Sequence, residues 1–421
     1  MKKVKEVLAK QLGLSRPSQE INEKIDIVSK KFVGDLRAKL KSRKIGADVF
    51  VGGSIAKKTL VKKGVYDIDV FVRFDKKYED DKISSLLGKV LAGFGGLKKV
   101  HGSRDYYQLK VEDILIEVVP VLKISKPLQA VNVTDLSYFH VNYILKKLRA
   151  NKKLGDEIVL AKAFAHAQGV YGAESYIHGF SGYGLELMTA HYGSFLKMIK
   201  EISKSEVSKD KKIVIDDAGF YKNKNEILIE LNESKLQSPI VLIDPTFKER
   251  NATSSLSYET FNKFKTACYN FLKSPSLEFF NKKDIAEDFE RFDTKIVSVK
   301  TDRQAGDIAG TKSKKFFDFF VYKLRKEFEI KKSGFDYDYV LNSAKFYFVV
   351  EPKKEEIVKG PPVVAVNNLT KFKKAHPKAF IKKGYAYVRI KHLLSFEEWF
   401  KEFVKKEKKI IREMSVVDVG V

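Results

Sequence analysis

The stretch GGSIAKKTLVKKGVYDIDVFVRF, residues 52–74, joins a turn rich in glycine and lysine to a strand that carries two acids. Side chains alternate between the two faces of a strand, so Asp67 and Asp69 share one face while Ile68 and Val70 point into the core. Two carboxylates about 7 Å apart along a strand repel each other unless a cation lies between them. The pattern predicts a divalent ion such as Mg²⁺. The alternative is a solvated D-x-D at a strand edge.

The turn before this strand has the residue types of a phosphate site. A strand, DVFVG, runs into Gly52, Gly53 and Ser54, and a short helix follows. This arrangement aims backbone N–H groups at one spot, and glycine allows a phosphate to approach closely. We therefore expect an anion-binding nest in which Ser54 caps the helix or donates to a phosphate oxygen. A simple capped turn is the alternative.

A third acid is expected on a later strand. The run ILIEVVP places Glu117 among apolar residues, on one face with Leu115 and Val119. A buried carboxylate without a partner is costly, so its presence there calls for a cation. In-line displacement at phosphorus uses such acids to hold metal ions.

Charge and composition indicate the kind of partner. The 421 residues include 80 Lys and Arg against 54 Asp and Glu, a formal net charge of +26. A polyanion is the first expectation from such an excess, and a solvated lysine-rich surface is the alternative. We find no apolar stretch long enough to span a membrane and no secretory signal, so no membrane partner is expected. The only cysteine, Cys268, cannot form a disulfide within the chain, which fits a reducing cytoplasm.

The chain is long enough for several domains. Residues 1–145 combine short strand-like runs with helical patterns, residues 146–275 are largely helical, and residues 276–421 mix a helix with β-rich runs. Ser274-Pro275 is a reasonable boundary. Ser18 is the expected cap of a long helix, and we expect one helical segment over 179–202 and a β-rich run VVAV at 363–366. The predicted fold is multidomain α+β.

Longer motifs add a resemblance to a known family. The G-S turn followed by D-x-D and a single later acid resembles the nucleotidyltransferases of the DNA polymerase β superfamily. Further along, the chain is similar to archaeal-type, class I CCA-adding enzymes, which add C, C and A to the 3′ end of tRNA without a nucleic-acid template. The similar stretches are YGAESYIHGFSGYGLELMTAHYGSFL (171–196), IDPTFKERNATSSLS (243–257), FLKSPSLEFF (271–280) and GPP (360–362).

The resemblance implies roles for particular residues. The family's metal ligands fall on Asp67, Asp69 and Glu117. Its nucleotide and triphosphate contacts fall on Gly53, Ser54, Lys57, His140, Lys162 and Tyr171, and its base-reading arginine falls on Arg250. The family more often has aspartate at the position of Glu117 and arginine at that of Lys57, and lysine lacks the bidentate fork of arginine. Taken alone, Lys162 could be a surface lysine on an amphipathic helix, Tyr171 a core residue and His140 a structural one.

The implied fold is a polymerase β-like catalytic head (1–145), a helical centre that completes the nucleotide pocket (146–275) and a mixed α/β carboxy-terminal part (276–421) that binds RNA. The implied substrates are CTP, ATP and tRNA, the last gripped at its acceptor arm and elbow, and the implied cofactor is Mg²⁺. Two alternatives remain at this stage: a poly(A)- or oligoadenylate-type polymerase, and an RNA-binding protein on an inactive transferase fold. The oligomeric state stays open, with a homodimer among the alternatives.

Overall fold

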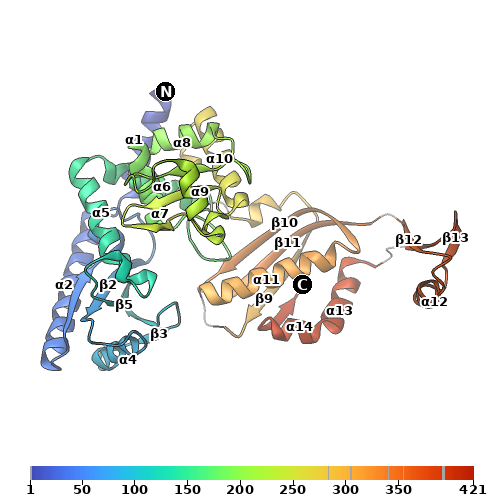
Figure 1. Ribbon diagram of the computed structural model, residues 1–421, viewed down its shortest axis with the longest axis horizontal. Coiled ribbons are helices and arrows are strands. Elements are labelled where there is room, and N and C mark those ends of the chain that lie inside the picture. Colours follow the sequence, from blue (N-terminus) through green and yellow to red (C-terminus); the bar gives the residue numbers. More distant parts are fainter. Residues whose placement is uncertain (1, 283, 304–305, 340, 354, 391–393) are drawn as a thin grey trace. The chain divides into compact units, whose positions relative to one another are not determined.

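The structure is a computed structural model that describes residues 2–282, 284–303, 306–339, 341–353, 355–390 and 394–421. The chain forms two compact units (Figure 1). The first runs up to Lys282 and leaves out Glu174–Tyr176, which belong to the second unit together with residues 284–421. The expected three-part division at about residues 145 and 275 stays a prediction.

A five-stranded sheet forms the base of the first unit. Its strands follow the order β1-β2-β5-β4-β3, and only β2 and β5 pair in parallel. The strands are β1 Ala47–Val51, β2 Tyr66–Phe74, β3 Lys98–Val100, β4 Tyr106–Val111 and β5 Ile114–Leu122. Helices α2 (Gln19–Ser42) and α4 (Asp80–Leu91) cover one face of this sheet with apolar side chains.

The alternation predicted for β2 and β5 is confirmed. Ile68 and Val70 are fully buried beneath α2 and α4, while Asp67 and Asp69 belong to the opposite, half-buried face. The predicted cap of α2 is also confirmed, because the hydroxyl of Ser18 accepts from the N–H of Ile21. The sheet thus has one face packed on helices and one face that carries acids.

A second apolar core gathers the remaining large helices of the first unit. Among them α6 is buried almost all round, so it is not the amphipathic helix predicted from its sequence. Helix α1 packs Val4 and Leu8 into the same core. These helices are α1 Lys2–Ser15, α5 Ser137–Ala150, α6 Leu154–Ala167, α7 Gly182–Tyr192, α8 Phe195–Lys204 and α10 Tyr258–Lys273.

The expectation of one helical segment over 179–202 is wrong. Gly193 ends α7 in the left-handed conformation with φ 76°, and the hydroxyl of Ser194 then caps α8 by accepting from the N–H of Lys197. The apolar spacing runs through this break, which is why the pattern alone did not reveal it.

A small sheet of β6 (Ile213–Ile215), β7 (Ile240–Asp244) and β8 (Phe247–Asn251) completes the first unit. Strand β7 is buried along its whole length, and β8 returns from it as the second arm of a hairpin. Helix α9 (Lys224–Glu230) lies in the connection between β6 and β7.

The second unit is built on a four-stranded sheet of order β10-β11-β9-β15, with α11 (Asp307–Leu324) packed on it (Figure 1). Its core is dominated by phenylalanine, including Phe316, Phe320, Phe346 and Phe348. The other elements of this layer are β9 Thr294–Thr301, β10 Phe328–Asp338, β11 Ser343–Pro352, β15 Val416–Gly420, α13 Phe396–Lys406 and α14 Lys408–Glu413.

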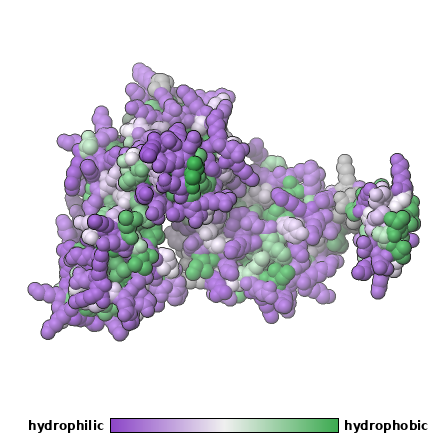
Figure 2. Space-filling model, viewed as in Figure 1, coloured by the Kyte–Doolittle hydropathy of each residue, from purple (hydrophilic) through white to green (hydrophobic). Residues whose placement is uncertain are grey.

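A separate three-stranded sheet holds β12 (Glu356–Pro362), β14 (Tyr385–Ile390) and β13 (Phe380–Lys382), with α12 (Val366–Ala375) beside it. The β-rich run VVAV predicted at 363–366 is wrong, because this stretch forms the turn that leads into α12. Hydrophobic residues gather on this small sheet and its helix, while hydrophilic residues cover most of the visible surface (Figure 2). Along the described parts of the chain, no helix combines the length and the apolar character that a bilayer crossing needs.

Candidate active site

The three predicted metal ligands lie on the open face of the parallel pair β2 and β5. Strand register places Asp69 directly opposite Glu117, and Asp67 opposite Leu115. Side chains two residues apart on one strand share a face, so all three acids belong to the same face of the sheet. The structure therefore brings these acids together as the alternation of the two strands predicted.

Two of the three acids, Asp67 and Glu117, contact other side chains of the protein. Asp67 forms an ion pair with Lys63, and Glu117 Oε1 accepts a hydrogen bond from Gln108 Nε2 at 2.6 Å. Gln108 stands opposite Glu117 in the pairing of β4 with β5. Within the described ranges, no three His, Cys, Asp or Glu side chains form a ready metal-binding cluster. Closing the three acids around an ion thus requires Asp67 and Glu117 to rotate away from these partners.

Burial and mutual repulsion disfavour the ionised forms of two of these acids, Asp69 and Glu117. Burial, and next the charge of Asp69, raise the pKa of Glu117 to about 7. Burial and the charge of Asp67 also raise the pKa of Asp69, against the opposing effect of Lys57, Lys63 and Lys162. A divalent cation bound between these carboxylates would favour their ionised forms, and oxygen donors of this kind are those that such cations prefer. The donor set therefore fits a divalent metal ion.

The glycine turn fits closely against the acid face. Gly53 has φ +59°, and a Cβ atom on it would overlap the carboxylate of Asp69. Any other residue here would have to adopt a left-handed backbone and displace the carboxylate of Asp69. Gly53 begins the single-turn helix α3 (Gly53–Ala56), so Ser54 lies in that turn beside the same face.

Lys57 and Lys162 meet at a buried glutamate that the sequence analysis did not single out. Glu186 is fully buried on α7 and accepts from Lys57 Nζ at 2.6 Å and from Lys162 Nζ at 2.7 Å. Lys162 also donates to Thr59 Oγ1 at 3.0 Å. Burial acts to raise the pKa of Glu186, but the two lysines hold it below its usual value. Lys162 is 4 % exposed, so the alternative of a surface lysine is wrong.

His140 and Arg250 meet at a second buried acid, Asp244, which ends β7. His140 Nε2 lies 2.9 Å from Asp244 Oδ2, and Arg250 Nη1 donates to the same oxygen at 2.8 Å. Tyr183 donates to Oδ1 at 3.1 Å and stacks on the His140 ring with centroids 4.0 Å apart. Burial raises the pKa of Asp244, yet His140 and Arg250 bring it well below its ordinary value. Burial also lowers the pKa of His140.

Tyr171 packs against the second core and stacks on His166, with ring centroids 3.9 Å apart. Burial, together with Lys63 and Lys162, lowers the pKa of His166 to about 4, so its ring is neutral at physiological pH. The positive charges of Lys63 and Lys162 thus act to lower the pKa values of both His166 and Asp69.

Four polar residues of these clusters were not predicted from the sequence: Gln108, Glu186, Asp244 and Tyr183. The first three are polar residues inside or at the end of apolar runs, in YYQLKV, GYGLELM and IVLID. This is the same signal that identified Glu117, and it could have found them. Tyr183 carried no comparable signal, because a tyrosine in an apolar helix is an ordinary core residue.

Comparison with known proteins places this chain in a family. Residues 30–152 match the family model "Nucleotidyltransferase domain", and residues 156–281 match "tRNA nucleotidyltransferase, second domain". Among solved structures, a cytoplasmic RNA terminal U-transferase covers 68% of this chain and 100% of its own, with a TM-score of 0.52 at 14% identity. At that identity the likeness concerns the fold alone.

The similarity to curated sequences is higher. The CCA-adding enzyme of Nanoarchaeum equitans is 36% identical over 354 residues, which are 83% of this chain and 85% of the relative. The CCA-adding enzyme of Methanocaldococcus jannaschii is 30% identical over an alignment of length 415, which covers 91% of this chain and 87% of the relative. Identity of this extent over most of both sequences means that the chain belongs to the family of CCA-adding enzymes.

Proposed function

We propose that this enzyme adds C, C and A to the 3′ end of tRNA from CTP and ATP, without a nucleic-acid template. The observation that carries the proposal is the shared face of β2 and β5, where Asp67, Asp69 and Glu117 stand beside Gly53 in a chain of this family. The poly(A)-type and non-catalytic alternatives have no specific observation in their favour.

Asp67, Asp69 and Glu117 are the residues that would hold the divalent cation, which we propose is Mg²⁺. When bound, the ion would supply Lewis-acid activation of the tRNA 3′-hydroxyl and neutralise charge on the triphosphate. The chain's own contribution is to place hard oxygen donors on one rigid pair of strands. In the absence of an ion, Asp67 pairs with Lys63 and Glu117 accepts from Gln108; both acids would have to leave these partners to hold a cation.

Lys57 and Lys162 are proposed to bind the triphosphate. With Glu186 they form a buried group of two positive charges and one negative charge, which leaves one net positive charge beside Asp69. A buried positive charge attracts a polyanion more strongly than an exposed one, because water screens it less. Ser54 and the backbone at Gly53 lie at the edge of the acid face, where they could donate to phosphate oxygens.

Arg250, His140 and Tyr171 are proposed to bind the nucleoside part. The planar guanidinium of Arg250 can donate two parallel hydrogen bonds to the edge of cytosine or adenine. Asp244 restrains it through Nη1, and the same acid orients His140. Tyr171 presents a ring already ordered by its stack on His166.

The tRNA partner follows from the family and from charge. With a formal net charge of +26, the chain can replace counterions along an RNA backbone. We propose that the acceptor arm and elbow are recognised mainly by the shape of A-form RNA, with the second unit as the principal RNA-binding part. We place the reaction in the cytoplasm, where the lone buried thiol of Cys268 stays reduced.

The deciding experiment uses tRNA that lacks its terminal trinucleotide, incubated with CTP alone, ATP alone and both nucleotides, followed by sequencing of the product ends. We expect addition of C, C from CTP and of C, C, A from the mixture. A long adenylate tail from ATP alone would favour the poly(A)-type alternative. No extension under any condition, with tRNA bound, would support the non-catalytic one.

A further inference from the structure

The hairpin that carries Arg250 has an irregular second strand. Its recorded pairs join Asp244 to Phe247 and Ile243 to Asn251. One step along β7 therefore corresponds to four steps along β8, which leaves Lys248, Glu249 and Arg250 outside the regular ladder. We call these three residues the Arg250 bulge. Bulges commonly re-aim a side chain next to a functional site, and their backbone groups need partners from elsewhere.

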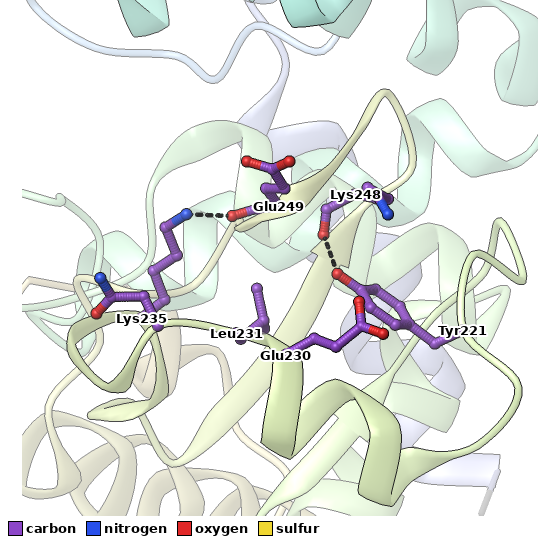
Figure 3. A pocket seen from close by; sticks show the side chains of 7 residues that line it. Tyr221, Glu230, Leu231, Lys235, Lys248 and Glu249 are labelled. Atoms are coloured by element: carbon purple, nitrogen blue, oxygen red, sulfur yellow. Dashed lines mark hydrogen bonds between the residues drawn. The ribbon is translucent and has the colours of Figure 1, made fainter.

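Two side chains from outside the hairpin supply those partners. Tyr221 Oη donates to the carbonyl of Lys248 at 2.9 Å, and Lys235 Nζ donates to the carbonyl of Glu249 at 2.6 Å (Figure 3). These are the two carbonyls that come directly before Arg250. The hydrogen bonds therefore fix the backbone from which the Arg250 side chain leaves.

Both donors are themselves anchored. Tyr221 packs against a small apolar cluster of Ile227, Leu231, Val241 and Ile243, and its N–H donates to Asp216 at 3.0 Å. Lys235 lies in a short 3₁₀ turn, Glu233–Leu236, and its own carbonyl accepts from Asn251 Nδ2 at 2.8 Å. The two donors thus connect the bulge to the part of the unit that surrounds α9.

A pocket of about 250 Å³ opens beside the bulge, lined by Tyr221, Glu230, Leu231, Asn232, Lys235, Lys248 and Glu249 (Figure 3). Where the Arg250 bulge borders this pocket, no close-packed side chains from the described part of the chain restrain its backbone. The hydrogen bonds of Tyr221 and Lys235 cross the edge of this space and limit how far the backbone can move into it.

We propose that Tyr221 and Lys235 are positioning residues for nucleotide selection, which act by holding the Arg250 bulge. This inference rests on the proposed role of Arg250 in reading the base edge. A bidentate contact with a base tolerates displacements of only about 0.5 Å, so a looser backbone should weaken recognition of the correct base more than it weakens binding of the triphosphate. Asp244 restrains the tip of Arg250, and the two donors restrain its base.

The test compares Tyr221→Phe, Lys235→Met and the double variant with the unchanged enzyme. The measured quantity is the ratio of kcat/KM for CTP to that for UTP, on tRNA that lacks its terminal trinucleotide. We expect each single variant to lower this ratio by about 3- to 10-fold, the size of one hydrogen bond, and the double variant to lower it further. Lys235→Arg keeps a donor and should retain most of the discrimination.

The same unit offers matched controls. Tyr258 Oη donates to the carbonyl of Ser208 at 3.0 Å, and Lys212 Nζ donates to the carbonyl of Ser238 at 3.2 Å, both outside the hairpin. Lys212 Nζ also donates to Tyr258 Oη at 2.7 Å, so Tyr258→Phe and Lys212→Met each remove a bond to a backbone carbonyl together with this shared bond. Both variants should leave the ratio unchanged. If the variants at 221 and 235 lower kcat/KM for CTP and UTP equally, their role is only structural and the inference is overturned.

Arg250→Ala, measured in the same assay, distinguishes the proposed role of Arg250 from the positioning role of Tyr221 and Lys235. If this variant loses discrimination while Tyr221→Phe and Lys235→Met keep it, the inference about positioning fails and the proposed role of Arg250 stands. If Arg250→Ala keeps the discrimination of the unchanged enzyme, the proposed role of Arg250 fails and the inference fails with it.

Discussion

Two groups of acids in the first unit differ in what neutralises them. Glu186 accepts hydrogen bonds from two lysines, and Asp244 contacts Arg250, His140 and Tyr183. The pKa values of both acids lie below the ordinary range despite burial. On the β2–β5 face, burial and mutual repulsion raise the pKa values of Asp69 and Glu117. Glu186 and Asp244 are fully buried, whereas Asp69 and Glu117 are only partly buried. The more deeply buried acids therefore have the lowered pKa values, so the partners, and not burial, decide the direction of the shift.

The difference teaches how to separate structural acids from acids that await a ligand. An acid that binds cationic side chains of the protein is stabilised in its ionised form by folding. Acids that repel one another on a partly buried face are stabilised in that form only when a cation from outside the chain binds them. Glu186 and Asp244 hold in place the side chains proposed to bind the nucleotide, and the acids of the β2–β5 face form the proposed metal site.

The largest effect is expected at Glu117. Glu117→Gln keeps the size of the side chain but removes the charge that would hold the cation, so kcat should fall by about 10⁴-fold or more, over 5 kcal/mol in the barrier. The affinity for tRNA should stay nearly unchanged. Glu117→Asp keeps the charge and should retain substantial activity. Single-turnover extension of tRNA and a separate tRNA-binding assay give the two readouts.

Glu112 supplies the matched control for this prediction. It lies in the turn between β4 and β5 and pairs with Lys24 away from the acid face. Its φ is 55°, so glutamine is a better replacement than alanine, because it changes the charge while keeping the length of the side chain. Near-normal turnover by Glu117→Gln, equal to that of Glu112→Gln, would mean that the third metal ligand lies elsewhere.

The next effect concerns stability at the other group of acids. Glu186→Gln leaves Lys57 and Lys162 buried without their counter-charge, and removing one partner of a buried ion pair typically costs about 3–5 kcal/mol of unfolding free energy. Hydrogen exchange of the amides of α6 and α7 measures this loss where it occurs. The only tryptophan, Trp399, belongs to the second unit, so its fluorescence reports on the other part of the chain.

Glu206, paired with Lys211 on the surface, provides the comparison for Glu186. Glu206→Gln should leave exchange in α6 and α7 unchanged, because exposed ion pairs contribute little. A similarly small effect of Glu186→Gln would show that the two lysines do not depend on this acid, and the division between the two groups of acids would lose one of its members.

A pH dependence of intermediate size should come from the acid face. The pKa of Glu117 rises from 4.5 to about 7 on folding, so this group contributes stability below about pH 4.5 that is lost as the pH rises through 7. The rise corresponds to a loss on the order of 3 kcal/mol in metal-free protein. Urea unfolding of the unchanged protein and of Glu117→Gln, each at pH 5 and pH 8 with a chelator, measures it.

The variant should lack this part of the pH dependence. His166 acts in the opposite direction, since its pKa is lowered to about 4 and its contribution is lost as the pH falls. Both proteins share that contribution, so it cancels in the difference between them. An identical pH dependence in the two proteins would contradict the raised pKa of Glu117.

Much of the acid face could be predicted because the pattern that specifies it lies within short stretches of sequence. The alternation in DIDVFVRF and ILIEVVP specifies which side chains share a face, and the parallel register of β2 and β5 places Asp69 opposite Glu117. The cap at Ser18 was equally local. By contrast, the helical spacing of apolar residues continues across Gly193. The break between α7 and α8 could therefore not be predicted from that spacing.

The partners of the buried acids could not be predicted in the same way. Lys57 lies 129 residues from Glu186, and His140 lies 104 residues from Asp244, so no spacing in the sequence connects them. The Arg250 bulge likewise depends on Tyr221 and Lys235, which tertiary packing brings to it. What a buried polar residue binds is decided by the fold, even where its need for a partner is evident from the sequence.

The smallest effect is expected from the metal ion itself. A cation that binds only the folded protein stabilises it by about 1.4 kcal/mol at ten times its dissociation constant, so MgCl₂ should raise the melting temperature of the first unit by a few degrees at neutral pH. Glu117→Gln should lose most of this increase, because it removes a ligand charge. Glu186→Gln, although less stable, should keep it, since Glu186 is neutralised by Lys57 and Lys162 and contributes no ligand. Differential scanning calorimetry of the three proteins, with and without MgCl₂, separates the outcomes. Equal stabilisation of all three would place the ion away from the acid face, and loss of the effect in Glu186→Gln would mean that the two groups of acids form one site rather than two.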